Sequence, residues 1–407
     1  MNTNSKKSKF IMLLVLFIFV FFFSNDFGLI DVEKTSIITA VAVDFEDEKY
    51  VVTAQIAVPE ATDTNTENQK AQLSGTGVTV GDALKDLGDV SGWFPKLSFC
   101  NLIILGSGVI QDNVIKAIDY FTKTLRVQDS ALIVLSEKNA KDLLTLATPL
   151  DNISAFALQK IILKNTGFDN DVAQADVKTF CADYYSISAS SYMPLIKVIP
   201  AGESKSDSNS GGGVQNSGGM NSGNSANDQK GDKDNLFDAK TTALFLGGEK
   251  VGELDENLTL TFNMITAPIK GTVIPIKDVL DENGKKSNYL LSVMRSIRSV
   301  KVKADENDFK VKIYLNLYCK ITDHTSSNSD YSLSQNIPIP DAVLNKAEEE
   351  IKNNINELLQ TSTNTGCDFL RLKQKLYRYN YKHYARYKEN YLSVLKPEIS
   401  VTVTGQR

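Results

Sequence analysis

The sequence predicts an α+β, or mixed α-β, protein of more than one domain, in which helices cover mixed or antiparallel sheets. At 407 residues, the chain is longer than one hydrophobic core usually serves. Strand-like apolar runs alternate with helical repeats between residues 37 and 147, as they do where helices cover a sheet. A second series of strands, two helical repeats and a last strand fill residues 241–404.

The first strands are expected to form a hairpin over residues 37–44 and 50–58, because two runs of alternating apolar residues flank a short polar stretch. The polar residues 62–74 are expected to form a loop, and residues 79–88 a helix with one apolar face. The remaining elements expected in this half are strands at 102–105 and 131–135 and helices at 111–125 and 140–147.

In the second half, residues 241–246 and 250–254 are expected to form a tight hairpin, because two glycines join two strand-like runs. A helix is expected to begin with Asp341 as its N-cap. A second helix is expected over 369–395, ended by Pro397. The other expected strands lie at 300–302, 309–321 and 399–404.

Between these halves the composition changes to Ser, Gly, Asn, Asp and Lys from residue 203 to about 235. This predicts a disordered linker. A phosphate-binding loop is the alternative, but no Lys-Ser or Lys-Thr pair follows the glycines. The expected divisions are an export signal or membrane anchor at 1–30, an N-terminal α-β domain at 31–202 and the linker at 203–237. A C-terminal α-β region at 238–407 follows, with a possible division into two subdomains near residue 290.

The N-terminus has the pattern of an export signal. Three lysines precede an unbroken apolar run at residues 10–23. Fourteen helical residues span about 21 Å, less than the roughly 30 Å hydrocarbon core of a bilayer. No A-x-A cleavage pattern follows, so an uncleaved anchor is expected, although the short length leaves cleavage open. A buried helix of a cytosolic protein is disfavoured, since the run has no polar face.

Charge and cysteine usage exclude two classes of partner. The net charge of -5 gives no basic field of the kind that nucleic-acid binding requires. The four cysteines, Cys100, Cys181, Cys319 and Cys367, have no metal-binding spacing, so no metal is expected. Their wide spacing favours isolated buried thiols, with disulfides as the alternative that an exported protein permits.

No catalytic residue and no cofactor site are predicted. The two histidines, His324 and His383, lie outside any HExxH pattern, and no GxSxG motif occurs. Both are expected to be solvated or packed side chains. An acid-base pair assembled in three dimensions stays open, so a secreted hydrolase is kept as a rival to a binding protein.

A basic stretch rich in tyrosine lies near the end of the chain. It interleaves six tyrosines with cations and contains one acidic residue, Glu389. A solvated helix face with tyrosines packed at its edges is the favoured interpretation, because charged helix faces are common. The alternative, in an exported protein, is a surface for an anionic membrane or an acidic partner. The residues of this candidate surface are Arg371, Lys373, Lys375, Arg378, Lys382, Arg386 and Lys388.

Several blocks of the sequence carry a resemblance to the Ger(x)C family, the C subunits of nutrient germinant receptors in spore-forming bacteria. The family opens its mature part with a pattern close to L-S-G-C-W-D-x-x-E-I-E-K, and FSNDFGLIDVEK at 23–34 aligns with it without gaps. The terminal V-x-V-x-x-G pattern is similar at Val401, Val403 and Gly405. The other similar blocks are 37–44, 99–106, 126–129, 131–135, 242–254, 347–359 and 368–370.

One departure bears on attachment to the membrane. Asp26 stands where the family has its lipid-bearing cysteine, so a thioether-linked lipid cannot form there. Tethering then depends on the apolar run or on partner subunits. The resemblance implies successive α-β domains, no catalytic residues, and association with an A subunit and a polytopic B subunit on the outer face of the inner spore membrane. An exported cell-wall or adhesion-type binding module is the second rival.

Overall fold

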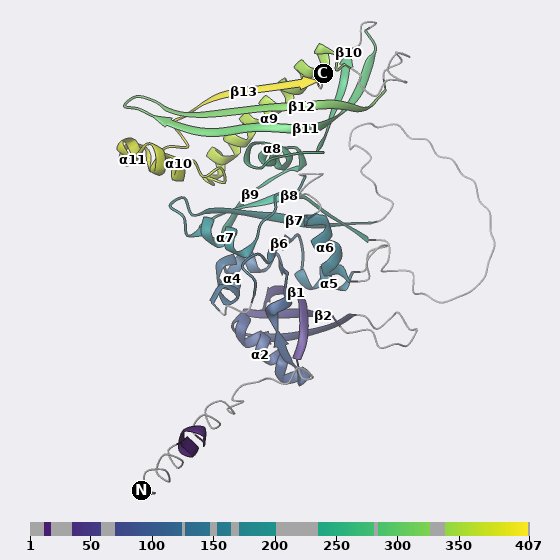
Figure 1. Ribbon diagram of the computed structural model, residues 1–407, viewed down its shortest axis with the longest axis vertical. Coiled ribbons are helices and arrows are strands. Elements are labelled where there is room, and N and C mark those ends of the chain that lie inside the picture. Colours follow the sequence, from purple (N-terminus) through teal and green to yellow (C-terminus); the bar gives the residue numbers. More distant parts are fainter. Residues whose placement is uncertain are drawn as a thin grey trace, which may run out of the picture.

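The computed structural model describes residues 12–17, 35–57, 70–123, 127–146, 153–163, 171–200, 235–280, 284–325 and 338–405. These residues form two sheets with helices packed on them, arranged one after the other along the long axis (Figure 1). The expected mixed α-β class is therefore confirmed.

The first sheet has nine strands in the order β3-β2-β1-β5-β6-β7-β8-β9, with β4 pairing to β1. Strands β1, β5, β6 and β7 are parallel neighbours at its centre, whereas the pairs on either side are antiparallel. Strands on both sides of the expected linker thus belong to one sheet. The strands are β1 (Thr35–Glu46), β2 (Lys49–Ala57), β3 (Lys70–Gly77), β4 (Phe94–Lys96), β5 (Leu102–Leu105), β6 (Leu132–Ser136), β7 (Ser190–Pro200), β8 (Asn235–Leu246) and β9 (Glu249–Leu254).

Helices cover both faces of this sheet, and the side chains of β5 show how its centre is buried. Ile103 and Leu105 pack in the core under α2, α4 and α7, while Leu102 and Ile104 pack in the core under α5 and α6. All four β5 side chains are fully buried, as in parallel sheets with two covered faces. The helices are α2 (Val80–Ser91), α3 (Val109–Asp112), α4 (Val114–Lys123), α5 (Ala140–Thr145), α6 (Ser154–Leu163) and α7 (Val177–Tyr184).

The second sheet has the order β10-β11-β12-β13, antiparallel except for the parallel pair of β12 and β13. The long helix α9 places Ala347, Ile351, Ile355 and Leu358 in the core of this sheet. Leu244 of β8 belongs to the same core cluster, so the two sheets are packed together through it. The elements are α8 (Glu256–Thr266), β10 (Val273–Leu280), β11 (Lys286–Ala304), β12 (Phe309–His324), α9 (Asp341–Thr365), α10 (Leu372–Tyr379), α11 (Tyr381–Tyr387) and β13 (Leu395–Gly405).

Most of the expected elements are present, but the loop predicted over 62–74 is wrong for its last residues, which belong to β3. β3 tolerates polar side chains because it is an edge strand whose backbone N–H and C=O groups are hydrogen-bonded to β2. The Ser74 and Thr53 hydroxyls lie 2.8 Å apart across the pair. Gly75 and Gly77 allow α2 to approach, since a Cβ at either would lie within 2.5 Å of the α2 backbone.

Two predicted helices are interrupted by asparagines. Asn113 divides 111–125 into α3 and α4, with φ of 112° and its Oδ1 accepting from the Ile115 N–H at 2.9 Å. Asn380 divides the second predicted helix, 369–395, into α10 and α11, because its Nδ2 donates to the Val302 carbonyl at 2.9 Å. The prediction is also too long, since α11 ends at Tyr387 and turns follow it. Local side-chain bonding of this kind competes with a continuous helix.

The predicted caps of the two C-terminal helices are also corrected. Pro340 is the N-cap of α9, and Asp341 is its first helical residue. Pro397 does not end a helix, because it lies in β13, which begins at Leu395. Proline is tolerated there since β13 is an edge strand.

Only part of the predicted export segment is described. Residues 12–17 are helical and exposed, while the lysines before them and Asp26 lie outside the described residues. Residues 201–234 also lie outside them; they include most of the expected linker at 203–237, whose last three residues instead belong to β8. Among the helices that the structure describes, none is long and apolar enough to span a bilayer.

Candidate functional site

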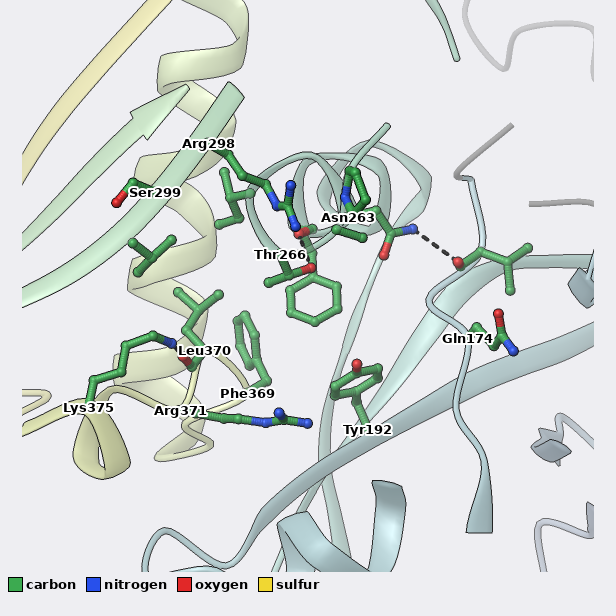
Figure 2. A pocket seen from close by; sticks show the side chains of 16 residues that line it. Gln174, Tyr192, Asn263, Thr266, Arg298, Ser299, Phe369, Leu370, Arg371 and Lys375 are labelled. Atoms are coloured by element: carbon green, nitrogen blue, oxygen red, sulfur yellow. Dashed lines mark hydrogen bonds between the residues drawn. The ribbon is translucent and has the colours of Figure 1, made fainter. Parts of the chain in front are cut away.

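A cavity of about 690 Å³ opens where the two sheets meet. Its walls come from the chain before α7, from β7, α8 and β11, and from the residues that lead into α10 (Figure 2). Tyr192 and Phe262 meet edge to face with ring centroids 4.9 Å apart, and Phe262 and Phe369 meet likewise at 5.6 Å. These contacts make a continuous aromatic wall from β7 through α8 to the start of α10.

Three cations line this cavity: Arg298, Arg371 and Lys375. No carboxylate is among its lining residues. In Figure 2 the Arg298 side chain extends from β11 toward α8, where Thr266 and Asn263 lie. Asn263 is fixed by a hydrogen bond from its Nδ2 to the Val172 carbonyl at 3.0 Å.

The segment of residues 366–371, here called the junction segment, connects α9 to α10 and is held against the first sheet. It begins at Gly366, whose φ of 70° ends α9. The Cys367 thiol donates to the Phe245 carbonyl at 3.3 Å, and the Asp368 N–H donates to Ser190 Oγ at 2.9 Å. Strands β7 and β8 are therefore bonded directly to the C-terminal helices.

Asp368 caps α10 from a buried position. Its two carboxylate oxygens accept the N–H groups of Leu372 and Lys373 at 2.7 and 2.8 Å, which satisfies donors at the start of the helix. Burial raises the pKa of Asp368 to about 6, although the two amides oppose this rise. Burial lowers the pKa of Lys375, and Asp368 opposes that change.

Arg371 is the last residue of the junction segment and forms an ion pair with helix α7. Its Nε and Nη2 lie 2.8 Å from Oδ1 and Oδ2 of Asp183 on α7, a bidentate pair. Burial raises the pKa of Asp183, and the Arg371 guanidinium opposes this rise. Arg371 has a φ of 55°, a conformation that costs a non-glycine residue energy. The contacts of this residue therefore maintain a locally strained backbone.

The basic stretch does not form one surface. Arg371 and Lys375 belong to the cavity, and Lys373 lies over the Tyr391 ring with 5.8 Å to its centroid. The other four cations, Arg378, Lys382, Arg386 and Lys388, are exposed on and after α10 and α11. Tyr377, Tyr379 and Tyr381 are exposed beside them. These seven residues are here called the tyrosine-cation surface.

The histidines and cysteines take no part in this site. His383 lies on α11 among tyrosines, as expected, and His324 ends β12 with its ring 6.1 Å from that of Tyr289. The cysteines are free thiols, three of them buried and Cys181 half-buried, so the isolated-thiol prediction holds. Among the described residues, no group of three or more His, Cys, Asp or Glu side chains can hold a metal ion.

Sequence reasoning identified Arg371 and Lys375 but not the cavity they line. Arg298, Tyr192 and Asn263 come from three distant parts of the chain, and no motif joins them. The block 368–370 was the one available signal, because it resembled the family and lies in the junction segment.

Two family models match nearly the whole chain outside the linker. Residues 29–198 match the spore germination protein N-terminal domain, and residues 240–406 match the spore germination B3/GerAC-like C-terminal domain. These matches define a spore germination protein. The chain belongs to the Ger(x)C family, which confirms the resemblance found in its sequence. Neither model describes an enzyme family.

A solved structure titled "Crystal Structure of the GerBC protein" is also similar. It has 14% sequence identity and a TM-score of 0.47, and the match covers 93% of this chain and 100% of that chain. No curated protein matches the sequence.

Proposed function

We propose that this protein is the C subunit of a spore germinant receptor. In this role it is a non-catalytic, extracytoplasmic protein that couples nutrient sensing to germination through protein-protein contacts at the inner spore membrane. The observation that carries the proposal is the ordered match of both family domains, at residues 29–198 and 240–406. The A and B subunits of the receptor are its proposed partners.

The junction segment supports a coupling role. A subunit that passes a signal between two partners needs its own parts mechanically connected. Here Asp368 and Arg371 connect the C-terminal helices to β7 and α7 through buried or half-buried hydrogen bonds. Displacing one sheet against the other would break these hydrogen bonds, and each group left buried without a partner would cost about 1–3 kcal/mol. The two sheets are therefore expected to move together when either one binds a partner.

The tyrosine-cation surface is the proposed contact for an acidic patch on a neighbouring subunit. Tyr379 and Tyr381 are 70% and 67% exposed. Tyrosine and arginine are also the residue types that contribute most of the binding energy at protein interfaces, so their exposure here favours a binding role. No acidic side chain pairs with Arg378 or Lys382 among the described residues. Both cations are thus available to a partner carboxylate.

The proposed location is the outer face of the inner spore membrane, with the apolar run at 10–23 as the anchor. The absence of a cysteine at position 26 means that this anchor works without a lipid at that position. Mass measurement of the N-terminus from isolated spore membranes distinguishes an intact run from a clipped one.

Affinity purification of the tagged protein from detergent-solubilised spore membranes tests the proposal. Recovery of the A and B subunits in amounts comparable to the tagged chain is the expected result. Recovery of the tagged chain without either subunit, under conditions where A and B purify together, contradicts it and favours a separate wall-binding module.

A further inference from the structure

We infer that the cavity between the two sheets binds a small organic anion, a carboxylate with an aromatic or otherwise apolar body. Its charged group would lie at Arg298 and its body against Tyr192, Phe262 and Phe369. The inference goes beyond the proposed receptor role and does not depend on it.

The charges around the cavity leave one cation in excess. Arg371 is paired with Asp183, and Lys375 interacts with the buried Asp368. Arg298 has no ion pair within the described residues, and burial alone lowers its pKa. A partly buried guanidinium without an ion pair is available to the carboxylate of a ligand. An arginine also presents a planar pair of donors that fits a carboxylate.

The rest of the lining selects an apolar body. Val172, Ile265, Val300 and Leu370 add aliphatic surface to the aromatic wall. The lining combines this apolar wall with polar and charged side chains, and small-molecule sites measure roughly 300–1,000 Å³. The observed 690 Å³ falls in that range. Because β7, α8, β11 and the junction segment all contribute, a ligand here would contact both sheets at once.

Calorimetric titration of the full-length protein in detergent with 3-phenylpropionate, phenylacetate and indole-3-acetate tests this site. Saturable binding of at least one of them is expected, weakened about tenfold or more by Arg298→Ala, since one charge-assisted pair contributes roughly that factor. Arg295→Ala is the matched control, because Arg295 lies on the same strand but is exposed and outside the cavity. The neutral 3-phenylpropanamide is expected to bind at least tenfold more weakly than its acid.

No saturable binding of any of the three acids would overturn the inference, as would equal affinity of the Arg298 and Arg295 variants. Binding of inorganic phosphate but of none of the acids would overturn it too. Arg298→Gln, which removes the charge but keeps more of the side chain than alanine does, replaces Arg298→Ala if circular dichroism shows that the alanine variant is unfolded.

A different surface carries a second inference, which rests on the proposed membrane tether. We infer that Val90, Trp93, Phe94 and Phe99, here called the Trp93 surface, lie in the headgroup region of the bilayer. These four side chains are between 45% and 76% exposed. They fall within ten residues that contain one charge, Lys96. Exposed apolar side chains this close together in the sequence point to an interaction site, and Trp and Phe favour the membrane interface.

The position of the chain argues for lipid as the occupant. Phe94 pairs with Thr35 at the start of β1, and eleven residues separate Thr35 from the apolar run that ends at residue 23. That stretch spans at most about 40 Å when extended. Helix α2, which leads into the Trp93 surface, lies at the end of the molecule opposite β13 (Figure 1). The C-terminal sheet and the tyrosine-cation surface would then point away from the membrane.

Trp93 is the single tryptophan of the chain, so its fluorescence reports on this surface alone. The full-length protein is reconstituted in vesicles with acyl chains brominated close to the headgroup, and flotation and quenching are measured together. Quenching of roughly twofold or more is expected for an interfacial tryptophan. The control is Trp93→Phe with Tyr379→Trp, which is expected to float equally and stay unquenched.

The two readouts separate the two proposals. Protein that fails to float contradicts the membrane tether itself. Protein that floats while Trp93 is quenched no more than the tryptophan at 379 leaves the tether standing and overturns the membrane contact of the Trp93 surface.

Discussion

Arg371 and Asp183 join parts of the chain that are 188 residues apart, through two contacts of 2.8 Å between guanidinium nitrogens and carboxylate oxygens. The Asp183 side chain is 9% exposed, so removing its partner leaves a nearly buried carboxylate unpaired. We expect Arg371→Ala to lower the free energy of unfolding by about 2–3 kcal/mol. Urea denaturation measures this change.

The control for that experiment is Arg378→Ala, because Arg378 is exposed on α10 and surface substitutions usually change stability by no more than about 0.5 kcal/mol. A double variant that also replaces Asp183 with Ala should recover part of the loss, since no charge remains buried. Equal stability of the Arg371 and Arg378 variants would show that the pair does not stabilise the junction segment.

Asp368 should make stability depend on pH. Its pKa is about 6 in the folded protein and 3.8 without the fold, so between these values the folded state holds a proton that the unfolded state has released. The free energy of unfolding of the wild type, relative to Asp368→Asn, is expected to fall as the pH rises from about 4 to 7. The fall is about 3 kcal/mol at most.

Chemical denaturation of both proteins at each pH measures that difference and cancels the titration of groups they share. A relative gain in wild-type stability over the same pH interval would contradict the raised pKa. A flat difference would mean that the carboxyl titrates as it does in the unfolded chain.

Gly106 is required by the close approach of the Asp44 carboxylate. A Cβ at this position would lie 1.9 Å from Asp44 Oδ1. That carboxylate caps α5 by accepting the N–H groups of Ala140 and Lys141 at 2.6 and 2.9 Å. Gly106→Ala should therefore destabilise the protein by more than about 2 kcal/mol, through overpacking and loss of the cap.

Thermal unfolding of Gly106→Ala is best compared with Gly405→Ala, whose Cβ would find its nearest atom at an ordinary 3.4 Å. The Gly405 variant is expected to unfold close to the wild-type temperature. If the two variants unfold at the same temperature, the position after β5 accommodates a Cβ and the role given to Asp44 is wrong.

The tyrosine-cation surface should affect binding but not folding. The double variant Lys382→Glu and Arg386→Glu is expected to keep the wild-type melting temperature, because both side chains are exposed on α11. Recovery of the A and B subunits with this variant should fall severalfold. Lys85→Glu, an exposed change on α2, is the control. Unchanged recovery of both subunits would mean that these cations are a solvated helix face.

Local patterns explain why much of the fold could be predicted from the sequence. Four consecutive large apolar residues at β5 indicate a strand buried on both sides, and two glycines with φ of 59° and 85° form the turn between β8 and β9. The β3 strand was missed because its polar residues depend on pairing with β2. The break in the last helix was missed because it depends on a contact between Asn380 and β11.

The candidate site was harder to predict for the same reason. Periodicity placed Arg371 and Lys375 in a basic stretch, but only their partners, Asp183 and Asp368, distinguish them from the exposed Arg378 and Lys382. Arg298 lies on a strand that carries four other cations, so nothing in its sequence context distinguishes it from the exposed ones. These residues line one cavity only because long-range packing brings their strands and helices together.

Germination of spores that lack this protein is the most direct test of its proposed role. With no paralogue present, loss of the protein should abolish or strongly slow the response to at least one nutrient, and the wild-type chain should restore it when supplied in trans. Release of dipicolinic acid after nutrient addition measures the response. Normal release on every nutrient in the deleted strain would contradict the receptor role.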